Sequence, residues 1–364
     1  MKIADVINYL EHLAPRSSQE SYDNSGLLIG DRNAAVKGVL VTLDCTEEIV
    51  DEALRTGCNL IVAHHPVIFK GLKSITGANY VERTVMACIK HDIALFAIHT
   101  NLDNYPFGVN YEIGQRIGLK DLRILAPKSG VLYKLNVFVP AAHHEVLSSA
   151  VFEAGAGSIG NYAECQFYTE GTGTFKPLEG ADPFSGEVNA LSKDSEIKAE
   201  YLVSSHRLKA VLKAMEKAHP YEEIAHDIIP LANQDRTEGS GMIGVLENEM
   251  DEIEFLGHLK QVFRCGAIRH TPLQKKKIRT VAFCGGSGSF LLGHAKASGA
   301  DVYITGDFKY HEFFDAEGEI LIADIGHYES EQFTSHLLAD ILKKKFTTFA
   351  VRLTEINTNP INYF

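Results

Sequence analysis

The chain has 364 residues, of which 45% are hydrophobic, and it carries a formal net charge of −12. A length of this order predicts two or three domains of ordinary globular composition. The acidic balance argues against nucleic acid as a main partner, because phosphate binding requires a basic surface, and no apolar run approaches the roughly 20 residues of a membrane span.

The N-terminal segment predicts a helix with one buried face. Its apolar residues stand at positions 3, 6, 7, 10 and 13, whereas a signal peptide has an unbroken apolar stretch. The six cysteines are scattered without a C-x-x-C pair, which is typical of reduced thiols in the cytosol rather than of a disulfide framework. We therefore expect a cytoplasmic protein.

Short apolar runs alternate with helical patterns from residue 37 to about 120, and the same alternation returns after residue 278. The runs are continuously apolar, which is typical of parallel strands that helices cover on both faces. We therefore predict an α/β fold with a split, three-layer core. The expected strands are 38–43, 60–63, 94–98, 278–284, 301–305 and 320–325, and the expected helices are a segment after Thr46, 79–90, 289–298, 308–316 and 329–345.

The middle of the chain differs in composition, because residues 166–198 contain much of the chain's Gly, Thr, Ser and Pro. The elements expected around this stretch have the order βαββαβ, which is the ferredoxin-like signature. They are strand 133–139, helix 143–154, strands 161–168 and 199–204, helix 206–218 and strand 224–229. We predict an inserted α+β domain at 129–235, which divides the core into a first half at 1–128 and a second half at 236–364.

Histidines and carboxylates follow four of the predicted core strands, at the point where each strand ends. Because ligands bind beyond the carboxyl ends of strands in open α/β sheets, we expect these segments to meet at one rim. A single histidine after a strand is more often a structural residue than a ligand, so the prediction depends on the recurrence. The segments are His64-His65-Pro66, His99-Thr100-Asn101-Leu102-Asp103, Gly306-Asp307 and Gly326-His327-Tyr328-Glu329-Ser330-Glu331.

The last of these segments suggests how a metal is held. His327 and Glu331 are four residues apart, so a helix that begins near Tyr328 places them on one face. Three imidazoles and two carboxylates exceed the three protein ligands usual for one catalytic zinc, and two ions bridged by Glu331 use them better. The predicted ligands of Zn²⁺, Fe or Mn²⁺ are His64, His65, Asp103, His327 and Glu331.

A glycine-rich turn, Gly285-Gly286-Ser287-Gly288, follows the strand expected at 278–284. Backbone N–H groups in such a turn bind anions, so these four residues are candidate ligands of a substrate phosphate. The turn matches neither the P-loop nor a complete dinucleotide-binding motif, and a tight connection between strand and helix explains it equally well.

Taken together, these segments resemble the Nif-three-like family, whose members are often named type-2 GTP cyclohydrolase I homologues. The resemblance covers both halves of the core. The middle segment, with His219-Pro220-Tyr221-Glu222-Glu223, is similar to the inserted PII/CutA-like domain of longer members, and Tyr22 stands where the family usually has Trp. The matching residues are Tyr22-Asp23-Asn24-Ser25-Gly26-Leu27, Ala63-His64-His65-Pro66, His99-Thr100-Asn101-Leu102-Asp103, Gly285-Gly286-Ser287-Gly288, Thr305-Gly306-Asp307 and Gly326-His327-Tyr328-x-Ser330-Glu331.

The resemblance implies a dinuclear centre, with two divalent metal ions per subunit held by the five ligands named above. Zinc is the first expectation for both ions, with iron or manganese as alternatives. The resemblance also implies a homohexamer of two stacked trimers, and it leaves the physiological substrate open.

Two functions are compatible with such a centre. The first is a metal-dependent hydrolase of a nucleotide or related phosphorylated compound, for which His99 and Asp307 are candidate general bases or proton shuttles. Opening the imidazole ring of GTP is one version of this reaction. The second is a non-catalytic metal-binding protein, either a metallochaperone or a ligand-sensing regulator, which the insert favours because PII-like and CutA-like folds bind small ligands without chemistry. We place the hydrolase first.

Overall fold

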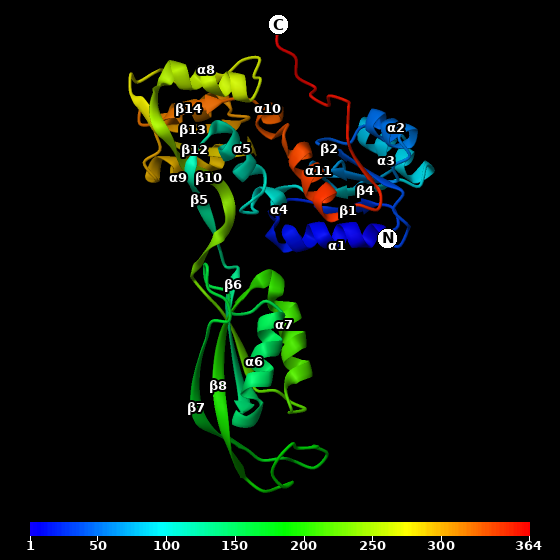
Figure 1. Cartoon of the computed structure of the whole chain (residues 1–364), viewed down its shortest axis with the longest axis vertical. Coiled ribbons are helices and arrows are strands. Elements are labelled where there is room, and N and C mark those ends of the chain that lie inside the picture. Colours follow the sequence, from blue (N-terminus) through cyan, green and yellow to red (C-terminus); the bar gives the residue numbers. More distant parts are fainter. The chain divides into compact units, whose positions relative to one another are not determined.

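The computed structural model describes all 364 residues and divides them into two compact units. One unit combines Met1–Pro127 with Thr237–Phe364, and the other is Lys128–Arg236. Figure 1 shows the elements of both units. No helix of the chain is long and apolar enough to cross a lipid bilayer.

Five strands form the first sheet of the larger unit. Their spatial order is β1 (Gly26–Ile29), β4 (Ala94–Ala97), β3 (Leu60–Ala63), β2 (Gly38–Thr42) and β15 (Ala350–Leu353). The strands β2, β3, β4 and β15 run parallel, and only β1 is antiparallel to its neighbour. Every residue of β2, β3 and β4 is buried, as the continuous apolar runs predict.

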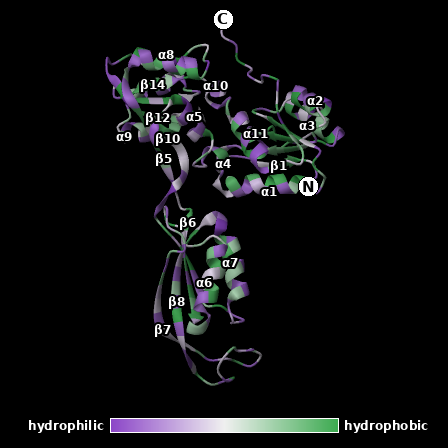
Figure 2. Ribbon diagram, viewed as in Figure 1, coloured by the Kyte–Doolittle hydropathy of each residue, from purple (hydrophilic) through white to green (hydrophobic).

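Helices cover both faces of this sheet, which confirms three layers. They are α1 (Ile3–Leu13), α2 (Glu47–Arg55), α3 (Tyr80–Lys90) and α11 (Thr334–Lys345). Val39 and Val62 face the side of α1 and α11, whereas Leu40 and Ile61 face α2 and α3. Hydrophobic and hydrophilic bands alternate along α1 in Figure 2, as its helical spacing predicts.

Six strands form the second sheet of the same unit. Their spatial order is β11 (Arg269–His270), β14 (Leu321–Asp324), β13 (Val302–Gly306), β12 (Lys277–Ser287), β10 (Gln234–Asp251) and β5 (Lys120–Ser129). The strands β12, β13 and β14 are parallel. The helices α5 (Val109–Ile117) and α8 (Glu252–Val262) pack on one face, and α9 (Leu292–Ala297) packs on the other.

The core strands form two sheets, and the segments expected at one rim come from both of them. Strands before and after the insert belong to different sheets, because a continuous apolar run identifies a buried strand but does not name its neighbour. The carboxyl ends of β3 and β4 nevertheless meet those of β13 and β14. His65, which follows β3, contacts Glu331, which lies 266 positions later in the chain.

The smaller unit has the ferredoxin-like arrangement. Its sheet has the order β7 (Gln166–Phe175), β8 (Ser192–Ser204), β6 (Leu132–Pro140) and β9 (His226–Pro230), and all neighbours are antiparallel. The helices α6 (His144–Glu153) and α7 (Ser205–Ala218) pack together and bury Leu147 and Val211 against this sheet.

Several expected boundaries differ from the observed ones. The strand expected at 161–168 lies at Gln166–Phe175. Its bounds follow from antiparallel pairing with β8, in which Gln166 lies opposite Tyr201 and Phe175 lies opposite Ser192. The segment 308–316 is a 3₁₀ helix at Tyr310–Ala316, and the helix expected at 329–345 is divided into α10 (His327–Glu331) and α11. The remaining short elements are α4 (Thr100–Asp103) and the 3₁₀ turns Arg16–Ser18, Ala141–His143 and Ser289–Leu291.

Candidate metal centre

His64 and His65 follow β3 at a bend in the chain, and both rings reach Glu331. His65 Nε2 lies 3.0 Å from Glu331 Oε2, and His64 Nε2 lies 3.9 Å from Glu331 Oε1. Consecutive side chains of a regular strand would point to opposite faces. The bend before Pro66 is therefore what brings both imidazoles to one place.

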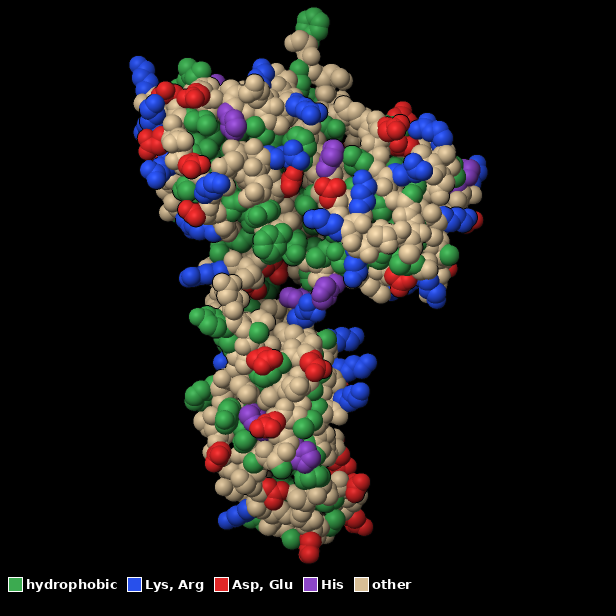
Figure 3. All heavy atoms as spheres, in the orientation of Figure 1, with side chains coloured by type: hydrophobic (Ala, Val, Ile, Leu, Met, Phe, Trp, Pro, Cys, Tyr) green, Lys and Arg blue, Asp and Glu red, His purple; other side chains and the backbone are tan.

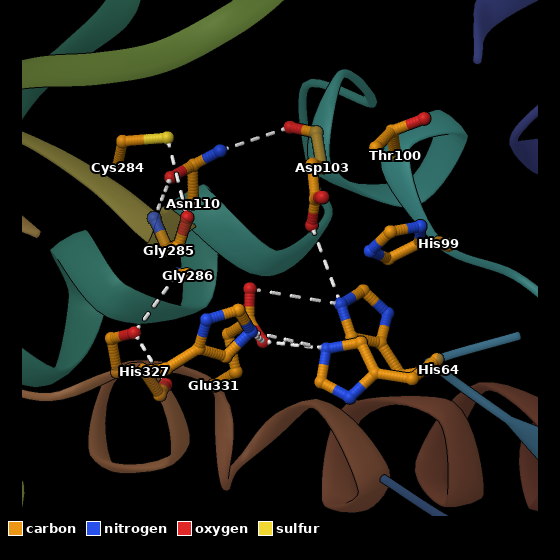
Figure 4. Close-up of polar contacts among 12 residues, drawn as sticks. His64, His99, Thr100, Asp103, Asn110, Cys284, Gly285, Gly286, His327 and Glu331 are labelled. Atoms are coloured by element: carbon orange, nitrogen blue, oxygen red, sulfur yellow. Dashed lines mark hydrogen bonds and ion pairs between the residues drawn. The ribbon is translucent and has the colours of Figure 1, made fainter. Parts of the chain in front are cut away.

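His327 and Glu331 lie on the short helix α10. They are four residues apart, and His327 Nε2 is 3.1 Å from Glu331 Oε2, as the sequence spacing predicts. The helix begins after Gly326, whose φ of +96° is a conformation that favours glycine. The Glu331 side chain is buried and faces His64 and His65, which follow β3 of the first sheet (Figure 4).

The side chains form two donor sets that share Glu331 (Figure 4). In the first, His64 Nε2 lies 3.7 Å from Asp103 Oδ1 and 3.9 Å from Glu331 Oε1. In the second, His65 Nε2 and His327 Nε2 are 3.4 Å apart, and both contact Glu331 Oε2. Donor atoms about 2.1 Å from a tetrahedral zinc lie about 3.4 Å apart, so both sets have the dimensions of a metal site.

Unpartnered buried atoms in the first donor set support this interpretation. His64 Nε2 and Asp103 Oδ1 are both buried without a hydrogen-bond partner. An unpaired buried polar atom costs about 1–3 kcal/mol, and a cation between these two atoms would satisfy both. Burial and the Glu331 carboxylate together raise the pKa of Asp103 well above its usual range, as expected where two carboxylates lie close together away from water. The residues fit a divalent ion.

Each imidazole of the proposed ligand set is fixed through its Nδ1 atom. A ring N–H that donates to an oxygen leaves the opposite nitrogen, Nε2, with a lone pair directed at the centre. Such partners set both the orientation and the basicity of a metal-binding histidine. The three bonds join His64 to the Ile98 carbonyl (2.8 Å), His65 to Asp44 (2.7 Å) and His327 to Asp307 (2.7 Å).

Two of these partners are carboxylates, and the sequence pointed to only one of them, Asp307. Asp307, a candidate general base or proton shuttle from the sequence, accepts a hydrogen bond from the His327 Nδ1–H. Its φ of +59° is a left-handed conformation that aspartate tolerates. Asp44 was missed, although it follows the end of β2 and the rule applied to the other strands would have found it.

Replacing Asp44 or Asp307 with asparagine is expected to weaken metal binding at the His65–His327 set by about 10- to 100-fold. Asparagine can still accept the hydrogen bond, but it removes the negative charge that makes the imidazole a stronger ligand. Competition with a chelator measures the change, with Asp51→Asn on α2 as the matched control. Equal affinities in the three variants and the wild type would contradict this role.

Metal binding is expected to release protons. Burial lowers the pKa of His65, but hydrogen bonds to Asp44 and Glu331 outweigh it and raise the pKa to about 10. Burial is similarly outweighed at His327, where Glu331 and Asp307 raise the pKa to about 11. Both rings are therefore protonated near neutral pH without metal, and an ion that binds them must displace these protons.

The apparent affinity should consequently rise with pH, by up to about tenfold per pH unit for each proton displaced, until the pH approaches these pKa values. Titration calorimetry of Zn²⁺ binding in buffers of different ionisation enthalpy counts the protons. A binding enthalpy that does not depend on the buffer would show that no proton leaves.

His99 forms a separate pair with Asp23 beside the centre. His99 Nδ1 lies 2.8 Å from Asp23 Oδ1, and the ring is edge-on to His64 at a centroid distance of 5.3 Å. Although burial alone would raise the pKa of Asp23, hydrogen bonds from His99, Thr100 and Ser25 hold it well below the usual range. The buried carboxylate is therefore a fixed negative charge that holds the His99 ring in place. Asp23 lies before β1 rather than after a strand. Polar residues at the carboxyl ends of strands therefore did not predict its contact with His99.

The glycine pair in Gly285-Gly286-Ser287-Gly288 packs against the Glu331 side chain. Strand β12 continues to Ser287, so the pair belongs to the strand rather than to a turn after residue 284. The N–H of Gly285 donates to Asn110, and that of Gly286 donates to Ser330. A Cβ at Gly286 would lie 2.4 Å from Glu331 Oε1. These two N–H groups are engaged within the protein and are not available to a phosphate, whereas Ser287 lines the pocket.

The centre lies in a pocket of about 450 Å³ within the larger unit. The pocket is lined by Asp103, Glu331, His65 and His327 together with aromatic side chains. Among the lining residues there is no lysine and no arginine. The aromatic side chains are Tyr22, Phe69, Phe290 and Tyr328, and Tyr22 and Phe69 lie 6.3 Å apart by ring centroids.

Comparisons with known proteins agree with this architecture. The model of a family described as Duf34/NIF3 (NGG1p interacting factor 3) matches residues 1–360. A protein of Halalkalibacterium halodurans named GTP cyclohydrolase 1 type 2 homolog is 42% identical over 371 residues, which is 100% of both chains. A crystal structure of a Bacillus cereus protein related to NIF3 has a TM-score of 0.86 at 38% identity, covering 100% of this chain and 99% of that one. A Staphylococcus aureus structure has a TM-score of 0.79 at 33% identity with the same coverage.

Proposed function

The chain belongs to the Duf34/NIF3 family, and from that premise we propose that it is a metal-dependent hydrolase of a nucleotide or a related phosphorylated compound. The observation that carries the proposal is the pair of donor sets sharing Glu331 in a pocket with aromatic walls. The name of the H. halodurans relative makes opening of the imidazole ring of GTP one specific version.

Two divalent ions would be held by the five residues predicted from the sequence. His64 and Asp103 would bind one ion, His65 and His327 the other, and Glu331 would give one oxygen to each. When bound, such ions supply Lewis acidity and lower the pKa of the water they hold toward 7. Imidazole and carboxylate donors suit zinc, and they also accept iron or manganese.

His99 is the residue best placed to move a proton in this pocket. It lines the pocket, it is not needed to complete either shared donor set, and Asp23 orients its ring through a hydrogen bond. A positioned imidazole of this kind accepts a proton from an attacking water and returns it to the leaving group. Asp307 acts through His327 and is a positioning residue in this account.

The aromatic side chains fit a substrate with a planar ring. Tyr22, Phe69 and Phe290 are each exposed by 45% or more and line the pocket, where a heterocyclic base could stack on them. Burial and nearby carboxylates raise the pKa of Tyr22 to about 12, so its hydroxyl remains a hydrogen-bond donor. Because no lysine or arginine lines the pocket, the two ions would supply the positive charge that a phosphate needs.

The direct test is turnover by metal-loaded protein on a panel of nucleotides that includes GTP. A variant with His64→Ala and Glu331→Ala, purified in parallel, is the reference because it lacks a donor from both sets. We expect turnover of at least one nucleotide by the wild type alone. Turnover no higher than that of the variant across the panel would refute the hydrolase.

The alternative is a metal handler without catalysis. The complete burial of His64 favours it, because a closed donor set retains its ion tightly. Transfer of the ion to a metal-free acceptor protein, together with no turnover on the panel, would support this function instead. Turnover that depends on His64 and Glu331 would exclude it as the sole function.

A further inference from the structure

The smaller unit contains a pocket of its own, which the metal chemistry does not use. Its volume is about 420 Å³, within the range of about 300–1,000 Å³ that is usual for small-molecule sites. The pocket lies where the connection between β7 and β8 folds back over the turn after α7. All of its lining residues belong to the same compact unit.

Four aromatic residues line this pocket, namely Phe138, Phe175, Phe184 and Tyr221. The Tyr221 ring lies 6.3 Å from the Phe175 ring and 5.9 Å from the Phe184 ring, measured between ring centroids. Phe184 is 54% exposed although it is large and apolar, which leaves one of its surfaces open to a ligand. The Tyr221 ring is inclined by 52° to the Phe175 ring and by 47° to the Phe184 ring. The rings therefore enclose a space like the sides of a box and do not stack on one another.

Carboxylates stand at the edge of the same box. Glu196 accepts a hydrogen bond of 2.9 Å from the Tyr221 hydroxyl, and Glu222 accepts one from the Asp182 N–H. Glu223 also lines the pocket, and Lys176 is its only basic lining residue. Figure 3 shows acidic side chains over the end of this unit that carries the loop between β7 and β8.

The local sequence holds this arrangement in place. His219 is buried and accepts a hydrogen bond from the Tyr221 N–H, while its Nε2 donates to the Phe138 carbonyl. On the other side, a Cβ at Gly173 would lie 1.9 Å from Glu196 Oε2, so glycine is required for the carboxylate to lie against β7. His219 therefore positions the Tyr221 ring, and Gly173 leaves room for the Glu196 carboxylate.

We propose that this pocket binds an organic ammonium ion. A cation within about 6 Å of an aromatic face is attracted by the ring quadrupole, and several faces around one cation form an aromatic cage. Phe175, Phe184 and Tyr221 supply the faces, and Glu196 and Glu223 supply the compensating negative charge. The volume admits an ammonium group together with the aliphatic chain that carries it.

The test uses the full chain and compares choline with 3,3-dimethyl-1-butanol, its uncharged isostere, by titration calorimetry. Spermidine forms a third arm, which distinguishes primary and secondary amines from a quaternary one. We expect choline or spermidine to bind at least about tenfold more tightly than the alcohol. We expect Phe184→Ala and Glu196→Gln each to weaken that binding by about fivefold or more, and Glu216→Gln on α7, outside the pocket, to leave it unchanged.

Phe184 is largely exposed, so its replacement should leave the unit folded, and circular dichroism of the variant checks this. Equal affinities for choline and its isostere would show an apolar pocket without cation selectivity and would overturn the proposal. Binding that persists unchanged in Phe184→Ala would place the cation elsewhere, for example in the acidic metal pocket, and would overturn it as well. So would the absence of binding by all three probes.

Discussion

Replacing Glu331 with alanine is expected to remove both metal ions and to lower hydrolysis by about 10²–10³-fold or more. Each Glu331 oxygen belongs to a different donor set, so the change leaves two donors at each position. Metal ions contribute several kcal/mol to stabilisation of the transition state, which corresponds to the stated loss of rate. Metal content measured by plasma emission spectrometry, alongside turnover, checks both effects.

Glu329 provides the matched control for this variant. It lies on the same helix and is also buried, but it belongs to neither donor set. Glu329→Ala should therefore retain both ions. If Glu331→Ala retained two ions per chain while Glu329→Ala behaved identically, the shared-carboxylate geometry would be contradicted.

The buried strands could be predicted from the sequence because their patterns are local. Runs such as Leu60-Ile61-Val62-Ala63 are apolar throughout, and only a strand covered on both faces needs that composition. The candidate ligands could be predicted with these strands, since each of their segments stands at or just after the carboxyl end of a strand. The spacing of His327 and Glu331 also predicted that both reach one centre, and they lie 3.1 Å apart.

The relation between distant segments could not be predicted in the same way. A local sequence pattern does not show whether the strands form one sheet or two. The long strand β10 was not predicted, because its residues alternate irregularly between buried and exposed. The partners of the histidine Nδ1 atoms are likewise long-range contacts. Asp23 meets His99 across 76 positions of the chain, and Asp44 meets His65 across 21. Gly286 is glycine because Glu331 lies against it, a reason that appears only in three dimensions.

Replacing His99 with alanine is expected to lower kcat by about 10²–10⁴-fold while both ions remain bound. The reason is that His99 moves a proton in this account and Asp23 orients its ring. The rate should recover in part when free imidazole is added, because imidazole can occupy the space of the missing ring. His91→Ala, at an exposed histidine after α3, should change neither kcat nor metal content.

This variant also separates two roles for His99. A ligand atom of its ring lies within 4.8 Å of those of His64 and His65, which is close enough for it to join the coordination of an ion. Loss of an ion in His99→Ala would show that it is a metal ligand. Retained ions, with a reduced rate that imidazole restores, would show that it is the proton shuttle.

The central claim is that two ions share Glu331, and anomalous diffraction from crystals of protein purified without added metal tests it most directly. Data collected at the absorption edges of zinc, iron and manganese identify each ion as well as its position. We expect two peaks about 3.5–4 Å apart, one beside His64 and Asp103 and the other beside His65 and His327. A single peak, or peaks that avoid the Glu331 carboxylate, would contradict the account.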